Sequence, residues 1–235
     1  RGVMEIPVWQ FVRIMVACEK RPNSRLLAAN QDSWTELDEA LSGLAQSDFD
    51  AYSHLMMHTN VHLSAPNKKN PFTDHPGVFE LVATQGGIAD EWHSDITFED
   101  QPSICSVLHM VKCPEVGGDT MWASLERAYD ELSTPMRDLC ESLTALHDAL
   151  PHNRPDKMAI HPVVRVHPET GKKSLFVNEH FTRRIVEMNW GESRALLNYL
   201  TEWVKNARFT VRYRWTQGTI AIWDNRCTQH FVLND

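Results

Sequence analysis

The sequence predicts an α+β protein with a jelly-roll core and helices packed outside it. Short segments rich in strand-forming residues dominate the second half of the 235-residue chain, and helices are inserted between some of them. Strands and helices do not simply alternate, and no glycine-rich phosphate loop follows a strand, which argues against a dinucleotide-binding fold. No internal repeat or low-complexity linker divides the chain, so we expect a single domain over residues 1–235.

The N-terminal third has the least regular pattern. Residues 8–16 favour either a strand or a buried helix, because periodicity does not separate the two. Apolar residues at helical spacing predict a helix over 34–44, and a suitable N-cap predicts a second helix over about 47–57. Residues 78–84 are rich in strand formers and end at a pair of glycines, so we expect a strand there.

Strands, turns and capped helices follow one another in the middle of the chain. An apolar run predicts a buried strand over 104–111, and a short strand is predicted over 120–123. Ser124 can cap the helix that follows, and Pro135 suits the first turn of a further helix. Apolar residues at helical spacing carry that second helix to residue 146.

The last third of the chain is expected to begin with a loop, which is followed by regular secondary structure. Residues 149–160 contain two prolines and no periodicity, which predicts the loop. Beyond it, the patterns predict a hairpin, a helix and two further strands, over 163–177, 192–206, 209–215 and 219–223.

The composition is that of a globular protein without a membrane anchor. Hydrophobic residues make up 42% and charged residues 23% of the chain, which allows a sizeable core. No apolar run approaches the roughly 20 residues of a membrane span, and no secretory leader opens the sequence. The formal net charge of -8 argues against nucleic acid as a partner.

Cysteine usage indicates a reducing compartment. The chain has 5 cysteines, an odd number, and no two have the C-x-x-C spacing of a zinc or redox site. Reduced thiols in a cytoplasmic protein explain this pattern best. Because the sequence begins with Arg1 rather than methionine, we expect the natural chain to begin earlier.

Three side chains predict a metal site. His93 and Asp95 are two residues apart, and share a face if the segment is extended, because side chains alternate along a strand. His230 comes shortly after the last predicted strand, and neighbouring strands of a barrel can bring it beside His93. Two imidazoles and one carboxylate can occupy one face of an Fe(II) ion and leave three positions for substrate and O2.

Spacing alone leaves other readings open, because the chain has 12 histidines and an H-x-D pattern arises by chance. His54 and His58 are four residues apart, but no glutamate forms H-E-x-x-H, so a scaffold role is favoured. His161 and His167 each precede a proline and suit the predicted hairpin. The remaining alternatives are His62, His75, His109, His147, His152 and His180.

Five blocks of the sequence resemble the taurine dioxygenase (TauD/TfdA) family of Fe(II)- and 2-oxoglutarate-dependent oxygenases. They occur in the family's order and extend over about three quarters of the chain, between residues 61 and 235. The block around His93 reads Glu-Trp-His-Ser-Asp-Ile-Thr-Phe, and the last ends Asp-Asn-Arg-Cys-Thr-Gln-His at His230. The blocks are residues 91–98, 117–124, 161–168, 176–179 and 222–230.

This resemblance implies a double-stranded β-helix core and assigns chemistry to named residues. It implies that His93, Asp95 and His230 bind Fe(II), and that 2-oxoglutarate chelates the metal through its keto oxygen and C1 carboxylate. It also implies that Thr120 hydrogen-bonds the distal C5 carboxylate. The family completes that anchor with an arginine about eleven residues after the last ligand, a position that lies past Asp235. We therefore expect terminal and loop segments to be absent from this sequence.

The substrate pocket differs from the taurine-type pattern. His62 matches a histidine that taurine-type members direct at the sulfonate, and Phe181 matches an aromatic residue that packs against the substrate. Ala65 and Ala89 stand where those members carry Tyr and Asn. One interpretation is a larger or more apolar substrate, such as an alkyl sulfonate or alkyl sulfate ester; the other is that neighbouring side chains restore the lost contacts.

The resemblance implies a dioxygenase that hydroxylates a small anionic organosulfur substrate, a sulfonate or alkyl sulfate, and releases succinate and CO2. O2 and the small molecule would be its partners, with no nucleic acid or membrane, and the family often forms dimers or tetramers. One alternative keeps this chemistry with a non-sulfur carboxylate, aryloxy acid or amino acid as substrate. Another is a cupin-like metal-binding module without turnover, because no anchoring arginine is visible.

Overall fold

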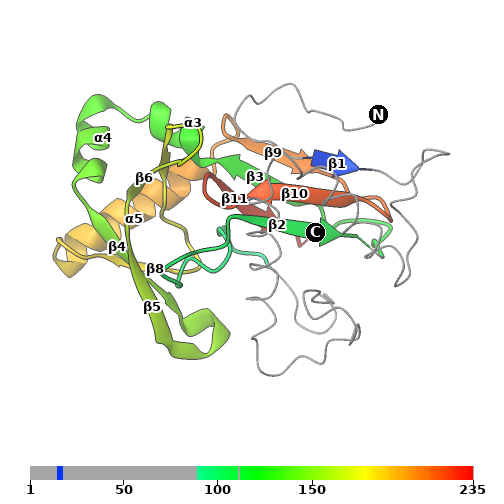
Figure 1. The fold of residues 1–235 in the computed structure, drawn as a ribbon, viewed down its shortest axis with the longest axis horizontal. Coiled ribbons are helices and arrows are strands. Elements are labelled where there is room, and N and C mark those ends of the chain that lie inside the picture. Colours follow the sequence, from blue (N-terminus) through cyan, green and yellow to red (C-terminus); the bar gives the residue numbers. More distant parts are fainter. Residues whose placement is uncertain (1–14, 18–88, 111, 235) are drawn as a thin grey trace.

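The computed structural model describes residues 15–17, 89–110 and 112–234 (Figure 1). Several predictions lie outside these residues: the two N-terminal helices, the scaffold role of His54 and His58, the strand over 78–84, and the positions of His62 and Ala65. Of the ambiguous run over 8–16, residues 15 and 16 are described, and they belong to a strand.

The described chain is a mixture of helices and antiparallel sheets, as predicted. One sheet has the order β1-β10-β2, formed by β1 (Met15–Ala17), β10 (Ile220–Asp224) and β2 (Cys105–His109). A second has the order β11-β3-β9, formed by β11 (Thr228–Val232), β3 (Thr120–Ser124) and β9 (Thr210–Tyr213). In Figure 1 the strands of these two sheets lie together, on the side of the molecule opposite α4 and β5.

A third sheet and a hairpin lie nearer the helices. The sheet has the order β5-β4-β8, formed by β5 (Arg154–Pro162), β4 (Thr144–Ala149) and β8 (Thr182–Ile185). The predicted hairpin is confirmed, with β6 (Val164–Val166) paired antiparallel to β7 (Lys173–Leu175).

The helices begin at the signals that the sequence provides. The Ser124 hydroxyl accepts the backbone N–H of Arg127 and caps α3 (Leu125–Asp130), as predicted. Helix α4 (Thr134–Glu141) has Pro135 in its first turn, where a missing N–H costs nothing. Helix α5 (Trp190–Val204) starts with a capping box, in which the side chains of Asn189 and Glu192 each bind the other's backbone N–H. No helix in the described part of the chain is both long and apolar enough to cross a bilayer.

Two predictions around residue 150 are wrong. Helix α4 ends at Glu141, and the residues expected to continue it form β4, where Ala145, His147 and Ala149 are buried at every second position. The buried histidine disguises this alternation. The expected loop over 149–160 is a short 3-10 turn η3 (Leu150–His152) followed by the strand β5. Among the described strands β5 pairs on one side only, with β4, and such an edge position tolerates Pro155.

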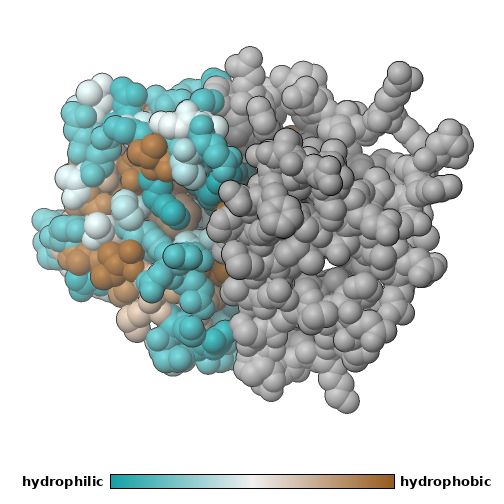
Figure 2. Space-filling view, viewed as in Figure 1, coloured by the Kyte–Doolittle hydropathy of each residue, from teal (hydrophilic) through white to brown (hydrophobic). Residues whose placement is uncertain are grey.

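Two apolar clusters fix this arrangement. The larger joins α3, α5, β4, β7 and β8, with Leu125, Leu200 and Ile185 fully buried. Burial of each such side chain contributes about 1.5–3 kcal/mol. The smaller joins the first two sheets, where Trp122 packs at 5.6 Å from Trp223. Figure 2 shows a mainly hydrophilic face over the helical side of the molecule, with separate apolar areas within it.

Candidate metal centre

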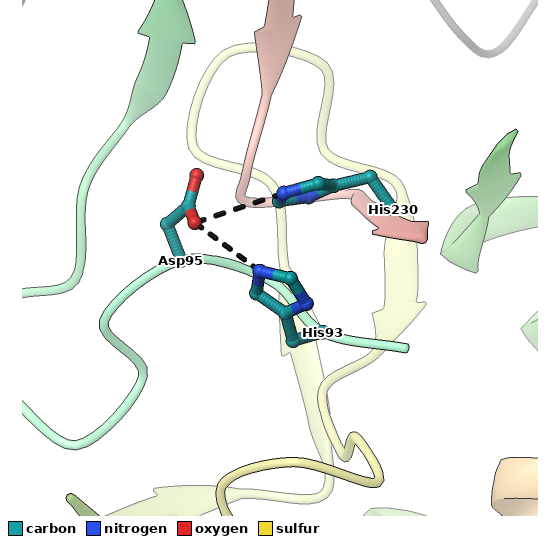
Figure 3. Close-up of side chains that lie close together, drawn as sticks. All are labelled: His93, Asp95 and His230. Carbon is teal, nitrogen blue, oxygen red and sulfur yellow. Dashed lines mark ion pairs between the residues drawn. The ribbon is translucent and has the colours of Figure 1, made fainter. Parts of the chain in front are cut away.

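The structure brings His93, Asp95 and His230 together (Figure 3). The Oδ1 atom of Asp95 lies 3.6 Å from Nε2 of His93 and 3.8 Å from Nε2 of His230. The two imidazole centroids are 4.1 Å apart. One ligand atom from each side chain lies within 4.8 Å of the other two, so all three can reach a single metal ion.

Backbone pairing places the two histidines on the same face. The N–H of His230 donates to the carbonyl of His93 at 2.8 Å, and the N–H of His93 donates back at 3.1 Å. Residues directly opposed in an antiparallel bridge point their side chains to the same side. His230 therefore lies within a strand, β11, that the sequence did not predict; it was expected only to follow one.

Asp95 reaches the centre from a turn. The chain is extended through Ser94, whose hydroxyl donates to the carbonyl of Thr228, and residues 95–98 then form a turn. Ile96 has a φ of 46°, which is rare for a β-branched residue. The expected extended segment is thus confirmed for His93 and corrected at Asp95, where the turn directs the carboxylate back toward both imidazoles.

The protonation of His93 suits a metal ligand. Its Nδ1 lies 2.7 Å from the carbonyl of Glu91, so in the neutral ring Nδ1 carries the proton and Nε2 has its lone pair toward Asp95. Burial lowers the pKa of His93, but the hydrogen bond and the negative charge of Asp95 outweigh it, and the net pKa is raised. A metal cation bound to Nε2 of His93 would compensate the negative charge of Asp95 in the same way as a proton on that nitrogen.

A second set of side chains orients Asp95. The Ser106 hydroxyl donates to Oδ2 of Asp95. The amide of Asn225 donates to Ser106 at 2.8 Å, and its oxygen accepts the Trp223 indole N–H at 3.1 Å and the Asp95 backbone N–H at 3.4 Å. Ser106 was not predicted as a site residue, although a polar residue within an apolar strand can indicate a functional position.

Residues 225–227 form the turn between β10 and β11 that presents His230. The guanidinium of Arg226 binds both Asp224 and Glu169, at 2.6 Å and 2.7 Å at their shortest. Burial raises the pKa of Asp224, but the bonds from Arg226 and His167 lower it below its usual range. His167 accepts backbone N–H groups of the hairpin at Nδ1 and donates from Nε2 to Asp224. These contacts make His167 a structural residue of the turn and the hairpin.

Thr120 lies on the same sheet face as His230. Trp122 is paired with His230 in the ladder, and Thr120 is two residues from it on β3. Thr120 is buried, and its hydroxyl oxygen accepts the indole N–H of Trp215 at 2.8 Å. The hydroxyl proton is therefore still available to a carboxylate acceptor.

Phe181 forms part of the wall beside the centre. Its ring is buried and meets the His93 ring edge-on, with centroids 6.0 Å apart. The ring of Phe98 also packs against Phe181, with centroids 5.2 Å apart. Of the two predicted substrate contacts, Phe181 thus lies next to the proposed ligands, and His62 is outside the described residues.

Two of the other histidines are held behind this wall. His147 is fully buried, with Nδ1 bonded to the hydroxyls of Thr97 and Thr182. His161, which was expected to serve the hairpin, instead lies on β5, where its Nε2 is 2.9 Å from the carbonyl of Thr97. Both side chains support the turn that carries Asp95.

Comparison with known proteins identifies related sequences. The family model described as taurine catabolism dioxygenase TauD, TfdA family, matches residues 39–231. An alkylsulfatase of Acinetobacter baylyi is 39% identical over 178 residues, which cover 67% of this chain and 56% of the relative. An alpha-ketoglutarate-dependent sulfate ester dioxygenase of Pseudomonas putida is 37% identical over 67% of this chain and 59% of the relative.

Solved structures show the same relationship. The crystal structure of a taurine dioxygenase from Burkholderia xenovorans superposes with a TM-score of 0.58 and 42% sequence identity, over 61% of this chain and 52% of that one. The chain thus spans less than two thirds of the length of each of these proteins. The family model extends over most of the sequence, so the chain belongs to the TauD/TfdA family.

Proposed function

We propose that this protein is an Fe(II)- and 2-oxoglutarate-dependent dioxygenase that hydroxylates a small organosulfur anion. The observation that carries the proposal is the convergence of His93, Asp95 and His230, which come from distant parts of the sequence, on one point. Family membership supports the proposal, and so do relatives named for sulfate ester and alkyl sulfate chemistry. The two central sheets would then be the described parts of a double-stranded β-helix.

The donor set fits iron. Two neutral imidazoles and one carboxylate bind first-row divalent metals, and three ligands on one face leave the opposite face open. His93 already presents its Nε2 lone pair, because Nδ1 is held by the Glu91 carbonyl. Asp95 presents Oδ1, because Oδ2 is held by Ser106. The ligand atoms are thus oriented before any metal binds.

Other residues near the centre would bind the co-substrate and the substrate. Iron and 2-oxoglutarate, when bound, supply the oxidation, in which one oxygen atom of O2 enters the substrate and the other enters succinate, with loss of CO2. Thr120 would donate its hydroxyl proton to the distal carboxylate of 2-oxoglutarate. Phe181, with Phe98 behind it, would exclude water and hold the substrate carbon beside the centre.

An alkyl sulfate is the substrate class that these residues favour. Hydroxylation of the carbon next to the sulfate oxygen gives a hemiacetal-like product, which collapses to an aldehyde and hydrogen sulfate. Ala89 is half-buried, and its carbonyl accepts the N–H of Val232, so it lies beside β11 just before His93. A methyl group at this position leaves more apolar space than an amide would.

Product analysis tests this proposal directly. The protein is loaded with Fe(II) without oxygen, mixed with 2-oxoglutarate and each candidate substrate, and exposed to O2. We expect an alkyl sulfate to yield succinate and sulfate in equal amounts, above the rates for taurine and for an aryloxyacetate. Succinate formation coupled only to the aryloxyacetate or to an amino acid would support the non-sulfur alternative. Tight metal binding with no succinate from any substrate would support a module without turnover.

A further inference from the structure

A second cavity lies behind the metal centre. It has a volume of ≈ 230 Å³ and is bounded by residues 100–104, the hairpin and the turn after β10. Its walls include Ser103, Arg165, Phe176, Asn225 and Arg226. None of the residues that line it is a proposed metal ligand.

The cavity contains a cation without an anionic partner. Arg165 is partly buried, and its guanidinium lies over the Phe176 ring at 4.4 Å from the centroid. Among the described residues, no Asp or Glu lies within ion-pair distance of it. Burial and the positive charge of Arg226 both lower the pKa of Arg165. A buried charge without a counter-charge is costly, and stacking on an aromatic ring offsets only part of that cost.

The cavity also contains a donor without an acceptor. Ser103 is fully buried, and its hydroxyl has no hydrogen-bond partner in the part of the chain that the structure describes. Such groups are rare in folded proteins, because each loses its bonds to water on burial. A single bound acceptor within this cavity would satisfy both groups.

The remaining buried polar walls are already engaged by other groups, and Gln101 is exposed to solvent. Arg226 binds Asp224 and Glu169, and the Asn225 amide binds Ser106. Asp100 also lines the cavity, but it is exposed to solvent, which screens its charge. Arg165 and Ser103 are therefore the groups that remain for a ligand.

We propose that this cavity binds a compact oxyanion between the guanidinium of Arg165 and the hydroxyl of Ser103. Several acceptor oxygens on one small ion match the fork of N–H donors on an arginine together with a separate hydroxyl donor. Asn225 separates this site from the centre, since its amide oxygen accepts the Asp95 backbone N–H on that side. The site is thus independent of the proposed catalytic function.

Sulfate is the probe for this site. Titration calorimetry at constant ionic strength, with chloride as the balancing ion, should show saturable binding of one sulfate per chain. We expect Arg165→Met to raise the Kd for sulfate at least tenfold, and Ser103→Ala to raise it about tenfold, because each removes a hydrogen bond to a charged acceptor. Arg184→Met, which removes an exposed cation on β8, should leave the Kd unchanged.

A repeat with the metal loaded and 2-oxoglutarate in excess separates this site from the centre, because occupancy of the centre would displace only an anion bound there. Sulfate binding that survives loading and is weakened by Ser103→Ala supports the proposal. An unchanged Kd in that variant, or heat no greater than that of chloride, overturns it. If Arg165→Met does not fold, Ser103→Ala decides alone, since it removes one buried oxygen and keeps the packing.

Discussion

The hydroxyl of Ser106 donates a hydrogen bond to Oδ2 of Asp95, while Oδ1 of the same carboxylate faces Nε2 of His93 and of His230. One oxygen is therefore held by the protein, and the other is left for the proposed metal.

Removal of this hydroxyl should weaken metal binding without breaking the fold. We expect Ser106→Ala to raise the Kd for Fe(II), or for Mn(II) as a stable substitute, by about 10–100-fold, the range for loss of a group that orients a ligand. Ser106→Thr keeps the hydroxyl and serves as the matched control. Equal metal affinity in Ser106→Ala and in the unmodified protein would show that Asp95 is held by other contacts.

Loss of the carboxylate itself should be more severe. Asp95→Ala leaves two imidazoles to bind the ion, and we expect coupled succinate and product formation to fall to background. Asp100→Ala, five residues further on and exposed, provides the control for a lost negative charge. Full hydroxylation by Asp95→Ala would contradict the assignment of the ligands.

The buried hydroxyl of Thr120 should act on 2-oxoglutarate rather than on the chemical step. Thr120→Val preserves shape but removes both the acceptor for Trp215 and the donor for the co-substrate. We expect the KM for 2-oxoglutarate to rise about tenfold with a smaller change in kcat. The lost acceptor should also lower stability by about 1–3 kcal/mol. Thr120→Ser retains the hydroxyl, so a KM near the unmodified value there would tie the effect to that group.

Acid should destabilise the protein through His147. Burial, with smaller contributions from the nearby cations, lowers the pKa of His147 from 6.5 to about 3. Between these two pH values His147 is protonated in the unfolded chain but neutral in the native state. The contribution of neutral His147 to the free energy of unfolding is therefore complete above pH 6.5. It is lost as the pH falls, by up to about 1.4 kcal/mol per pH unit.

Chemical denaturation between pH 7 and pH 4 measures this loss. The variant His147→Asn keeps a polar atom near Thr97 but has no titrating group, so its free energy of unfolding should vary less with pH. A pH dependence as steep as that of the unmodified protein would assign the acid sensitivity to other groups.

Much of the fold follows from local signals. Ser124 caps a helix and Pro135 opens one, where the sequence places them, and the strand before them, β3, is found within one residue of its predicted bounds. These features depend on neighbouring residues alone, so local sequence carries them. The set of His93, Asp95 and His230 was predicted with the help of the family resemblance, because spacing alone did not exclude other histidines as ligands.

The segments that the sequence did not reveal are strands with buried polar residues. In β11 the buried positions include Thr228, Gln229 and His230, so no apolar alternation marks the strand. Their polar groups are satisfied by distant partners, as when the Gln229 amide donates to the carbonyl of Val177 at 2.6 Å. Such partners cannot be read from a local pattern, and departures of this kind are expected around functional sites.

The backbone bridge between His93 and His230 also bears on how the protein is made. A growing polypeptide carries His93 and Asp95 well before its last described strand has been synthesised. Because side chains alternate along a strand, a slip of one residue in that final pairing would turn the His230 imidazole away from the other two ligands. Binding of the proposed metal would therefore require β11 to pair in the correct register, and a chain in which this pairing slips would lack the third ligand.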